Sequence, residues 1–314
     1  MFDNKIHITP EDYIHDLTEK DCKDYLFIAP VGELLNNEMS DVYYQKDAFV
    51  PYHEHQKGYE TFCIDRGSVE VTINGKRAVA EAGDIVHIEP YTSHGFRYLE
   101  EGTIWRELFH EMNMYGGIME KRLIERSCPE KLEDDVFMAQ YRRRHHTIRL
   151  GEPEPELVDK HQMPQIRPKG EGIARFEFEG IRCNQKVGRH ETGGVKEIWE
   201  FEADKGICAE WSCLHPGWDL YVVKEGSVEV TVLGETFTAK ARDILHFPPY
   251  TGYTMKVLEA GTVIHANNVG AIGLRLAEIV EKKLQGDLDL AKNWEQVKEI
   301  FEQNHSYLVK ICKA

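Results

Sequence analysis

Three histidines and a glutamate near the start of the chain have the spacing of a metal site. His53 and His55 stand one residue apart in PYHEHQKGYETF, and Glu60 follows shortly after them. A β-strand sends alternate side chains to the same face, so His53 and His55 would point together. Glu60 would follow a tight turn at Lys57-Gly58 onto the neighbouring strand, and His94, in GDIVHIEPYTSHGF, would supply the remaining donor.

This donor set would leave a bound ion open to further ligands. Three neutral imidazoles and one carboxylate give a divalent ion a net charge of about +1, and octahedral coordination would leave two adjacent positions free. Fe, Mn, Ni or Co suit such a site and Zn is compatible with it, so the sequence predicts one divalent transition metal ion per chain without choosing among them. Structural metal sites are usually closed, so open positions indicate a role beyond holding the fold.

Two classes of function fit an open metal site of this kind. In an enzyme, the ion would act as a Lewis acid on a small substrate that chelates it through oxygen atoms, and Glu60 would be catalytic by moving a proton. Isomerase, lyase or decarboxylase, and dioxygenase chemistry all remain open. The alternative is a non-catalytic, metal-dependent protein that binds or senses a small molecule.

Aromatic residues are expected beside the four donors. Counting by twos from Glu60 reaches Phe62, and counting from His94 reaches Phe96 and Tyr98, so all three should point inward. An aromatic lining suits a substrate with a ring or an apolar body. Side chains that simply fill the interior of a barrel would give the same pattern.

The elements that position these residues occur twice in the chain. The stretch from Gly67 to Val71 recurs letter for letter from Gly226 to Val230, an offset of 159 residues, and the same offset relates three further matches. Alternation in SVEVTINGKRAVA and SVEVTVLGETFTA predicts short antiparallel strands, with a hairpin turn at Asn74-Gly75. Many short strands of this kind are typical of antiparallel barrels.

These motifs resemble those of the cupin superfamily. His53-x-His55-x4-Glu60-x6-Gly67 and Gly83-Asp84-x5-Pro90-x3-His94 are similar to the two cupin motifs, and the duplication resembles that of a bicupin. The resemblance implies an all-β fold of two tandem jelly-roll-like barrels, each followed by α-helices, and it implies His53, His55, Glu60 and His94 as metal ligands. Cupins support many reactions, so the resemblance does not define the chemistry.

The second repeat departs from the metal motif. Cys213, His215 and Asp219 replace the HxHx4E pattern, and Tyr253 replaces the last histidine. A tyrosine binds metal weakly unless it is ionised, which for an unperturbed side chain requires a pH near about 10. We therefore favour a second barrel without metal, although this set of residues leaves open whether it binds anything.

We expect three segments along the chain. Residues 1–141 would form the first barrel with its metal site and helical tail, and residues 173–314 would form the second barrel with its own tail. The intervening residues 142–172 are rich in charge, Pro and Gly and read as a linker. The cluster from Arg142 to His146 at the start of the linker is interpreted as a solvated or salt-bridging surface.

Charge and composition limit the partners. The 314 residues contain 54 acidic and 38 basic side chains, a formal net charge of −16, which disfavours nucleic acid and anionic membrane as partners. No secretory signal or apolar run long enough to span a bilayer is evident, so we expect a cytoplasmic location. A small-molecule substrate or ligand is the expected partner, and a homodimer is compatible with the sequence.

Overall fold

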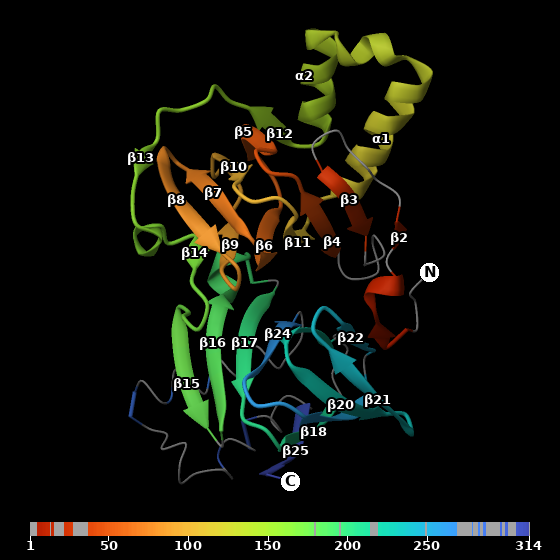
Figure 1. The fold of residues 1–314 in the computed structure, drawn as a ribbon, viewed down its shortest axis with the longest axis vertical. Coiled ribbons are helices and arrows are strands. Elements are labelled where there is room, and N and C mark those ends of the chain that lie inside the picture. The colour runs from red at the N-terminus through yellow and green to blue at the C-terminus, as the bar shows by residue number, and fades with distance from the viewer. Residues whose placement is uncertain are drawn as a thin grey trace. The chain divides into compact units, whose positions relative to one another are not determined.

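The protein divides into two compact units built mainly from antiparallel β-sheets. Unit 1 comprises Met1–Phe2 and Tyr13–Lys169, and unit 2 comprises Asp3–Asp12 and Gly170–Ala314. The computed structural model describes residues 5–12, 14–15, 22–27, 37–178, 180–194, 196–213, 219–248, 250–268, 278, 282, 285–286, 296, 299–300 and 306–313 (Figure 1).

Unit 1 contains two sheets with an apolar core. Their strand orders are β14-β9-β6-β11-β4-β3-β2 and β12-β5-β10-β7-β8-β13, and the pairing is antiparallel apart from β13, which runs parallel to β8. The expected alternation is present in SVEVTI, where Val69, Val71 and Ile73 are buried. The strands are β2 (Ile14–His15), β3 (Cys22–Phe27), β4 (Asn37–Tyr44), β5 (Phe49–His55), β6 (Tyr59–Arg66), β7 (Ser68–Ile73), β8 (Lys76–Glu81), β9 (Ile85–Ile88), β10 (His94–Tyr98), β11 (Thr103–His110), β12 (Thr147–Arg149), β13 (Glu156–Leu157) and β14 (Ile166–Arg167).

Two helices follow the last long strand of unit 1, as expected. Helix α1 (Met114–Ser127) begins after Asn113, whose side chain accepts a hydrogen bond from the Gly116 amide. A short 3-10 helix, η2 (Pro129–Leu132), leads to α2 (Asp135–Arg144), which Asp134 caps in the same way. The helices form a hairpin, and the chain then enters β12, which pairs with β5 (Figure 1).

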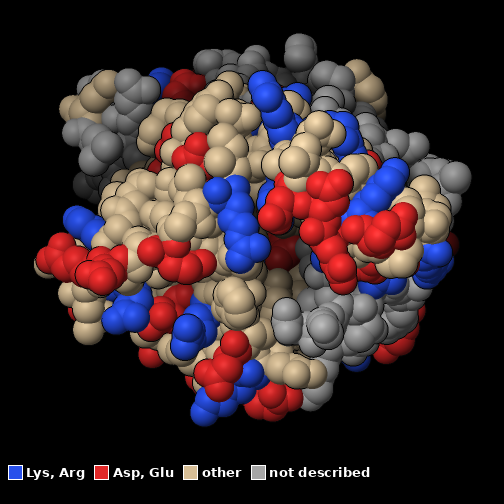
Figure 2. Space-filling model, turned by 90° about the horizontal axis from the view of Figure 1, so that it is seen from above, with Lys and Arg blue, Asp and Glu red and all other residues tan. Residues whose placement is uncertain are grey.

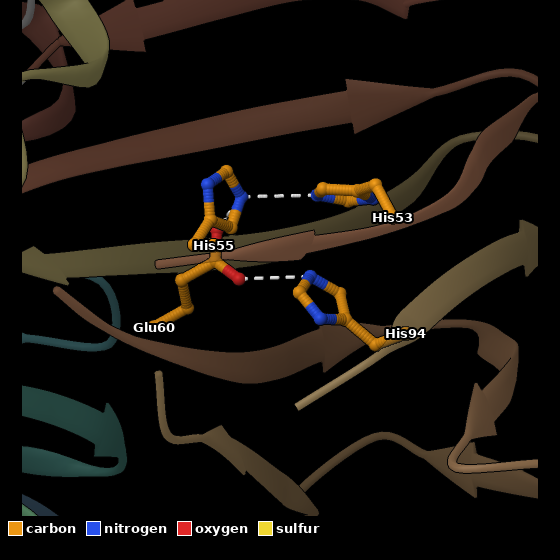
Figure 3. A group of neighbouring side chains, drawn as sticks. All are labelled: His53, His55, Glu60 and His94. Atoms are coloured by element: carbon orange, nitrogen blue, oxygen red, sulfur yellow. Dashed lines mark hydrogen bonds and ion pairs between the residues drawn. The ribbon is translucent and has the colours of Figure 1, made fainter. Parts of the chain in front are cut away.

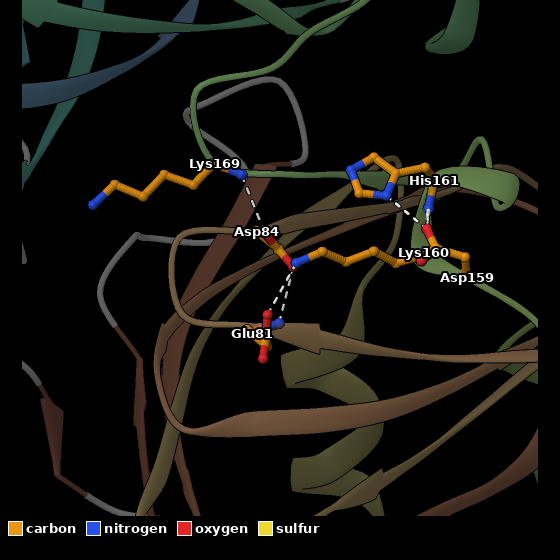
Figure 4. Close-up of polar contacts among 6 residues, drawn as sticks. All are labelled: Glu81, Asp84, Asp159, Lys160, His161 and Lys169. Carbon is orange, nitrogen blue, oxygen red and sulfur yellow. Dashed lines mark hydrogen bonds and ion pairs between the residues drawn. The ribbon is translucent and has the colours of Figure 1, made fainter.

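Residues 147–167, which the sequence assigns to a linker, contribute β12, β13 and β14 to unit 1. Figure 4 shows how buried Asp84 anchors this segment: its carboxylate accepts hydrogen bonds from the Lys160 ammonium at 2.8 Å and from the Lys169 amide at 3.1 Å. A carboxylate that bonds both a side chain and the backbone holds the segment against the β8–β9 turn. The predicted limits of the two domains and the linker remain a prediction.

Unit 2 repeats the arrangement of unit 1. Its strand orders are β1-β22-β19-β24-β17-β16-β15 and β21-β20-β23-β18-β25. The helical tail expected after this barrel falls mostly outside the described residues. The strands are β1 (His7–Ile8), β15 (Ala174–Phe178), β16 (Ile181–Val187), β17 (Glu197–Ala203), β18 (Ile207–Cys213), β19 (Asp219–Glu225), β20 (Ser227–Val232), β21 (Glu235–Lys240), β22 (Ile244–Phe247), β23 (Gly252–Val257), β24 (Thr262–Asn268) and β25 (Ser306–Lys313), with 3-10 helices η1 (Pro10–Asp12), η3 (Lys160–Gln162) and η4 (Arg189–Glu191) along the chain.

The two repeats exchange a short strand. Strands β1 and β14 are related by the same 159-residue offset, yet each pairs within the unit formed by the other repeat. Ile166 pairs with Val86 in unit 1, and His7 pairs with Leu245 in unit 2, which is the same register once the offset is applied. Each unit therefore completes one sheet with a strand from the other repeat.

Among the helices that the structure describes, none has the length and apolar character needed to cross a membrane.

Candidate metal centre

The four predicted ligands come together inside unit 1 (Figure 3). His53 and His55 lie on β5, Glu60 lies near the start of β6, and His94 is the first residue of β10. The pairing of β5 with β10 places His53 directly opposite His94. One potential ligand atom from each of the four residues lies within 4.8 Å of all the others.

The distances between donors fit a single ion. The His53 and His55 Nε2 atoms are 3.0 Å apart, and Glu60 carboxylate oxygens lie 3.3 Å from His55 Nε2 and 2.9 Å from His94 Nε2. With metal–ligand bonds of about 2.1 Å, adjacent donors around one ion are separated by about 3 Å. His94, His55 and Glu60 are 0%, 4% and 3% exposed, so few water molecules are available to satisfy these atoms in place of an ion.

The outer nitrogen of each imidazole has its own partner. His53 Nδ1 lies 2.8 Å from the Pro51 carbonyl oxygen, and His94 Nδ1 lies 2.8 Å from that of Thr92. A carbonyl only accepts, so both Nδ1 atoms must donate, which leaves the Nε2 lone pairs directed inward. His55 Nδ1 lies 3.1 Å from the Thr147 hydroxyl on β12. Partners of this kind orient histidine ligands at metal sites.

Burial and charge shift the pKa values of His53, His55 and Glu60. Burial, reinforced by the neighbouring His94, lowers the pKa of His53 to about 3. Burial would raise the pKa of the Glu60 carboxyl, but the charges and hydrogen bonds of His55 and His94 outweigh it and hold that pKa well below its usual value. Burial also acts to lower the pKa of His55, yet the Glu60 carboxylate raises it overall. An incoming cation would therefore meet an ionised carboxylate and displace a proton from His55.

The candidate centre lies in a cavity of about 670 Å³. This volume is within the usual range for sites that bind small molecules. Residues of the barrel, the β5–β6 turn, the helical hairpin and β12 line it: Tyr44, Val50, Pro51, His53, His55, Lys57, Glu60, Phe62, His94, Phe96, Trp105, Glu107, Phe109, Glu111, Met112, Asn113, Met114, Gly117, Ile118, Lys121, Tyr141, Arg142, Arg144, His145, His146, Thr147 and Arg149.

Strand parity accounts for only part of this lining. Phe62 and Phe96 border the cavity, whereas Tyr98, predicted beside them, is fully buried and stacks on Tyr44 with ring centroids 3.5 Å apart. Sequence reasoning missed Trp105 and Phe109, because TIWRELFH on β11 is buried along its whole length and does not alternate apolar with polar residues. The lining residues from the helical hairpin also had no signal in the sequence, because they reach the cavity only when the hairpin folds back onto the barrel.

The corresponding positions in unit 2 hold a different polar cluster. The Tyr253 hydroxyl donates to the Asp219 carboxylate at 3.0 Å and lies 2.7 Å from the Tyr221 hydroxyl, and all three side chains are buried. The Cys213 side chain and His215 lie outside the described residues. Within the described part of the chain, no second group of His, Cys, Asp and Glu side chains is close enough to share an ion.

Comparison with known proteins identifies the fold. A family described as "Cupin domain" matches residues 40–104, a range that contains all four candidate ligands. Searches against curated proteins found no match. Among solved structures, Bacillus subtilis oxalate decarboxylase studied for its Mn(II) centres is 16% identical, with a TM-score of 0.54 over 98% of this chain and 89% of that one. The same enzyme at pH 4.6 is 15% identical, with a TM-score of 0.54 over 98% and 88%.

At this level of identity, the solved structures establish the shared fold alone. Together with the family match, they confirm the predicted cupin architecture and the two tandem barrels. The three imidazoles and one carboxylate form a donor set suited to one divalent transition metal ion.

Proposed function

We propose that this chain, which has the fold of two tandem cupin barrels, is a metal-dependent enzyme whose small substrate chelates the ion through oxygen atoms. His53, His55, Glu60 and His94 would hold the ion. The observation that carries the proposal is the convergence of these donors in a cavity large enough for a substrate. A metal that only stabilised the fold would need no such space beside it.

A bound ion would supply Lewis acidity toward substrate oxygen atoms. The protein's contribution is to orient the imidazoles through their Nδ1 partners and to place an ionised carboxylate beside them. Glu60 is buried, and its pKa lies well below the usual value, so it is a carboxylate at neutral pH. We assign it the transfer of a proton to or from the substrate.

Lyase chemistry, including decarboxylation, or isomerase chemistry fits these groups best. Isomerisation removes and returns a proton, and decarboxylation needs a proton delivered to the carbon that loses CO2; a positioned acid or base contributes about 10² to 10⁴ in rate. Dioxygenation would require a redox-active ion and gives the Glu60 carboxylate no evident task. The resemblance in fold to oxalate decarboxylases is compatible with lyase chemistry without demanding it.

The test combines metal analysis with substrate depletion. Metal-loaded and metal-free protein would each be incubated with a cell metabolite extract, and compounds consumed only by the loaded form would be identified by mass spectrometry. Glu60→Gln retains the shape and one oxygen donor of Glu60 but is a far weaker base. We expect this variant to keep most of its metal while losing at least about a hundredfold in turnover per bound ion.

Two outcomes would contradict the proposal in different ways. Turnover that survives in Glu60→Gln in proportion to bound metal would make Glu60 a ligand without a role in proton transfer. If no compound is consumed, while a metabolite raises the melting temperature only when metal is bound, a binding or sensor function should replace the enzymatic one.

A further inference from the structure

Positive charge gathers around the cavity of a strongly acidic protein. Five basic side chains line it: Lys57, Lys121, Arg142, Arg144 and Arg149. Three carboxylates also line it: Glu60 belongs to the candidate metal centre, Glu107 accepts hydrogen bonds from Ser40 and the Trp105 indole at 3.2 and 2.9 Å, and Glu111 is the third. Figure 2 shows basic and acidic side chains interspersed on one face of the molecule, so the net charge of −16 is not spread evenly over its surface.

These cations differ in whether a protein carboxylate neutralises them. Arg144 forms an ion pair with Glu120 at 2.6 Å. Among the residues that the structure describes, by contrast, Lys57, Arg142 and Arg149 form no ion pair. Arg142 gives the strongest indication of an anionic ligand, because its side chain is half-buried and lines the cavity near the end of α2. A partly desolvated guanidinium without an anion is unfavourable, and an anionic ligand would relieve that cost.

The wall beside the candidate metal centre is aromatic. Phe62 stacks on Trp105 with centroids 4.2 Å apart and meets Phe96 and Phe109 edge to face at 5.1 and 6.2 Å. All four rings are buried within unit 1 and all border the cavity. Flat apolar surface of this kind binds rings and hydrocarbon chains rather than small polar ions.

We infer that the substrate is an organic acid with an apolar body about the size of a ring. Its body packs on the wall formed by Phe62, Phe96, Trp105 and Phe109, and its negative charge is met by Arg142, with Lys57 and Arg149 nearby. This inference rests on the proposed function, since it assigns a substrate class to the same site. It excludes oxalate as the preferred substrate, because oxalate consists of two joined carboxylates and has no apolar body.

Three related probes separate the features of such a ligand. Mandelate carries a phenyl ring on a 2-hydroxy acid, glycolate has the same acid without the ring, and mandelamide has the same ring without the negative charge. Calorimetric titration of the metal-loaded protein should give mandelate at least about tenfold higher affinity than either of the others. Equal or weaker binding of mandelate relative to glycolate would overturn the inference.

A neighbouring arginine provides a matched control. Arg142→Gln should weaken mandelate binding about tenfold or more, whereas Arg143→Gln should leave it unchanged, because Arg143 is exposed and does not line the cavity. Arg142→Lys, which keeps the charge, should restore part of the affinity. Equal effects of Arg142→Gln and Arg143→Gln would refute the role of Arg142, and melting temperatures would show that the variants remain folded.

Metal analysis of the same samples distinguishes this inference from the proposed function. A chain that takes up no metal would contradict the proposed function. The order of affinities and the effect of Arg142→Gln should persist at weaker binding in metal-free protein, because the aromatic wall and Arg142 do not depend on the ion. Loss of that order in both forms would count against the substrate class alone.

Discussion

Thr147 offers a direct test of whether the segment after the helical hairpin supports the candidate metal centre. Its hydroxyl lies 3.1 Å from His55 Nδ1, and the pairing of β12 with β5 in the same sheet places Thr147 opposite His55. For His55 Nε2 to bind a metal, Nδ1 must carry the proton and Thr147 Oγ1 must accept it. Thr147→Val removes this acceptor while keeping a β-branched side chain suited to a strand.

The expected magnitude follows from the role of outer partners at metal sites. Loss of such a partner typically weakens metal affinity by about 10- to 100-fold, which corresponds to about 1.4 to 2.7 kcal/mol. Thr147 is half-buried, and its backbone pairing with β5 does not involve the hydroxyl, so the stability of the metal-free protein should change by less than about 1 kcal/mol.

Competition with a fluorescent chelator at constant pH would measure the metal dissociation constant of each variant. Thr147→Ser keeps the hydroxyl and should remain within about threefold of the original affinity. An affinity of Thr147→Val equal to that of the unmodified protein would refute the positioning role. So would an equal loss in Thr147→Ser, because the hydroxyl would then not be the group that matters.

Three further predictions concern the ion, pH and the chain itself. Element analysis should find close to one transition metal ion per chain. The His53→Ala and His94→Ala variants should lose this ion and remain folded. Two ions per chain that both persist in His94→Ala would contradict a single site at these ligands. The pKa of His55 is raised from 6.5, and a metal ion must displace the proton of this side chain. Metal affinity should therefore weaken as pH falls through that raised pKa, beginning above 6.5. A metal affinity that stays constant between about pH 8 and 6 would contradict the assignment of His55 as a ligand. Cleavage near residue 155 should leave compact fragments that stay associated, since β1 and β14 are exchanged between the repeats. Fragments that separate as folded monomers would show that the exchanged strands are not needed for folding.

The candidate ligand set could be predicted because its geometry is local. His53 and His55 share a strand, Glu60 follows one turn later, and His94 begins the strand that pairs with β5. Alternation along a strand and the short β5–β6 turn are enough to bring these four residues together. The repeated strand pattern predicted the two barrels for the same reason.

Features that depend on contacts distant in sequence could not be predicted in this way. Arg142 was read as part of a solvated or salt-bridging surface, and Arg144 does pair with Glu120, but only the folded hairpin brings Arg142 to the cavity. Residues 142–172 were interpreted as a linker from their composition. Strands as short as β12 and β14 leave little periodic signal in a sequence, so they could not be recognised there. The burial of Tyr98 away from the cavity likewise depends on packing against Tyr44, on another strand.

In unit 2, the positions that correspond to Glu60 and His94 hold a hydrogen-bonded pair. The offset relates Glu60 to Asp219, Phe62 to Tyr221 and His94 to Tyr253. An isolated buried carboxylate would be costly, but Asp219 accepts a hydrogen bond from Tyr253, whose ring also stacks on Phe247 with centroids 3.7 Å apart. A hydroxyl donor thus stabilises the buried Asp219 carboxylate in unit 2, as a bound cation would stabilise the Glu60 carboxylate in unit 1.

Each of the two exchanged strands covers a sheet edge in the unit that receives it. Strand β9 of unit 1 pairs with β14 from the second repeat, and β22 of unit 2 pairs with β1 from the first. Equivalent carboxylates secure both segments, since Asp84 binds Lys160 and Asp243 lies 2.8 Å from His7 Nε2. Removal of β14 would therefore leave β9, which pairs with the Glu60 strand, as an open sheet edge.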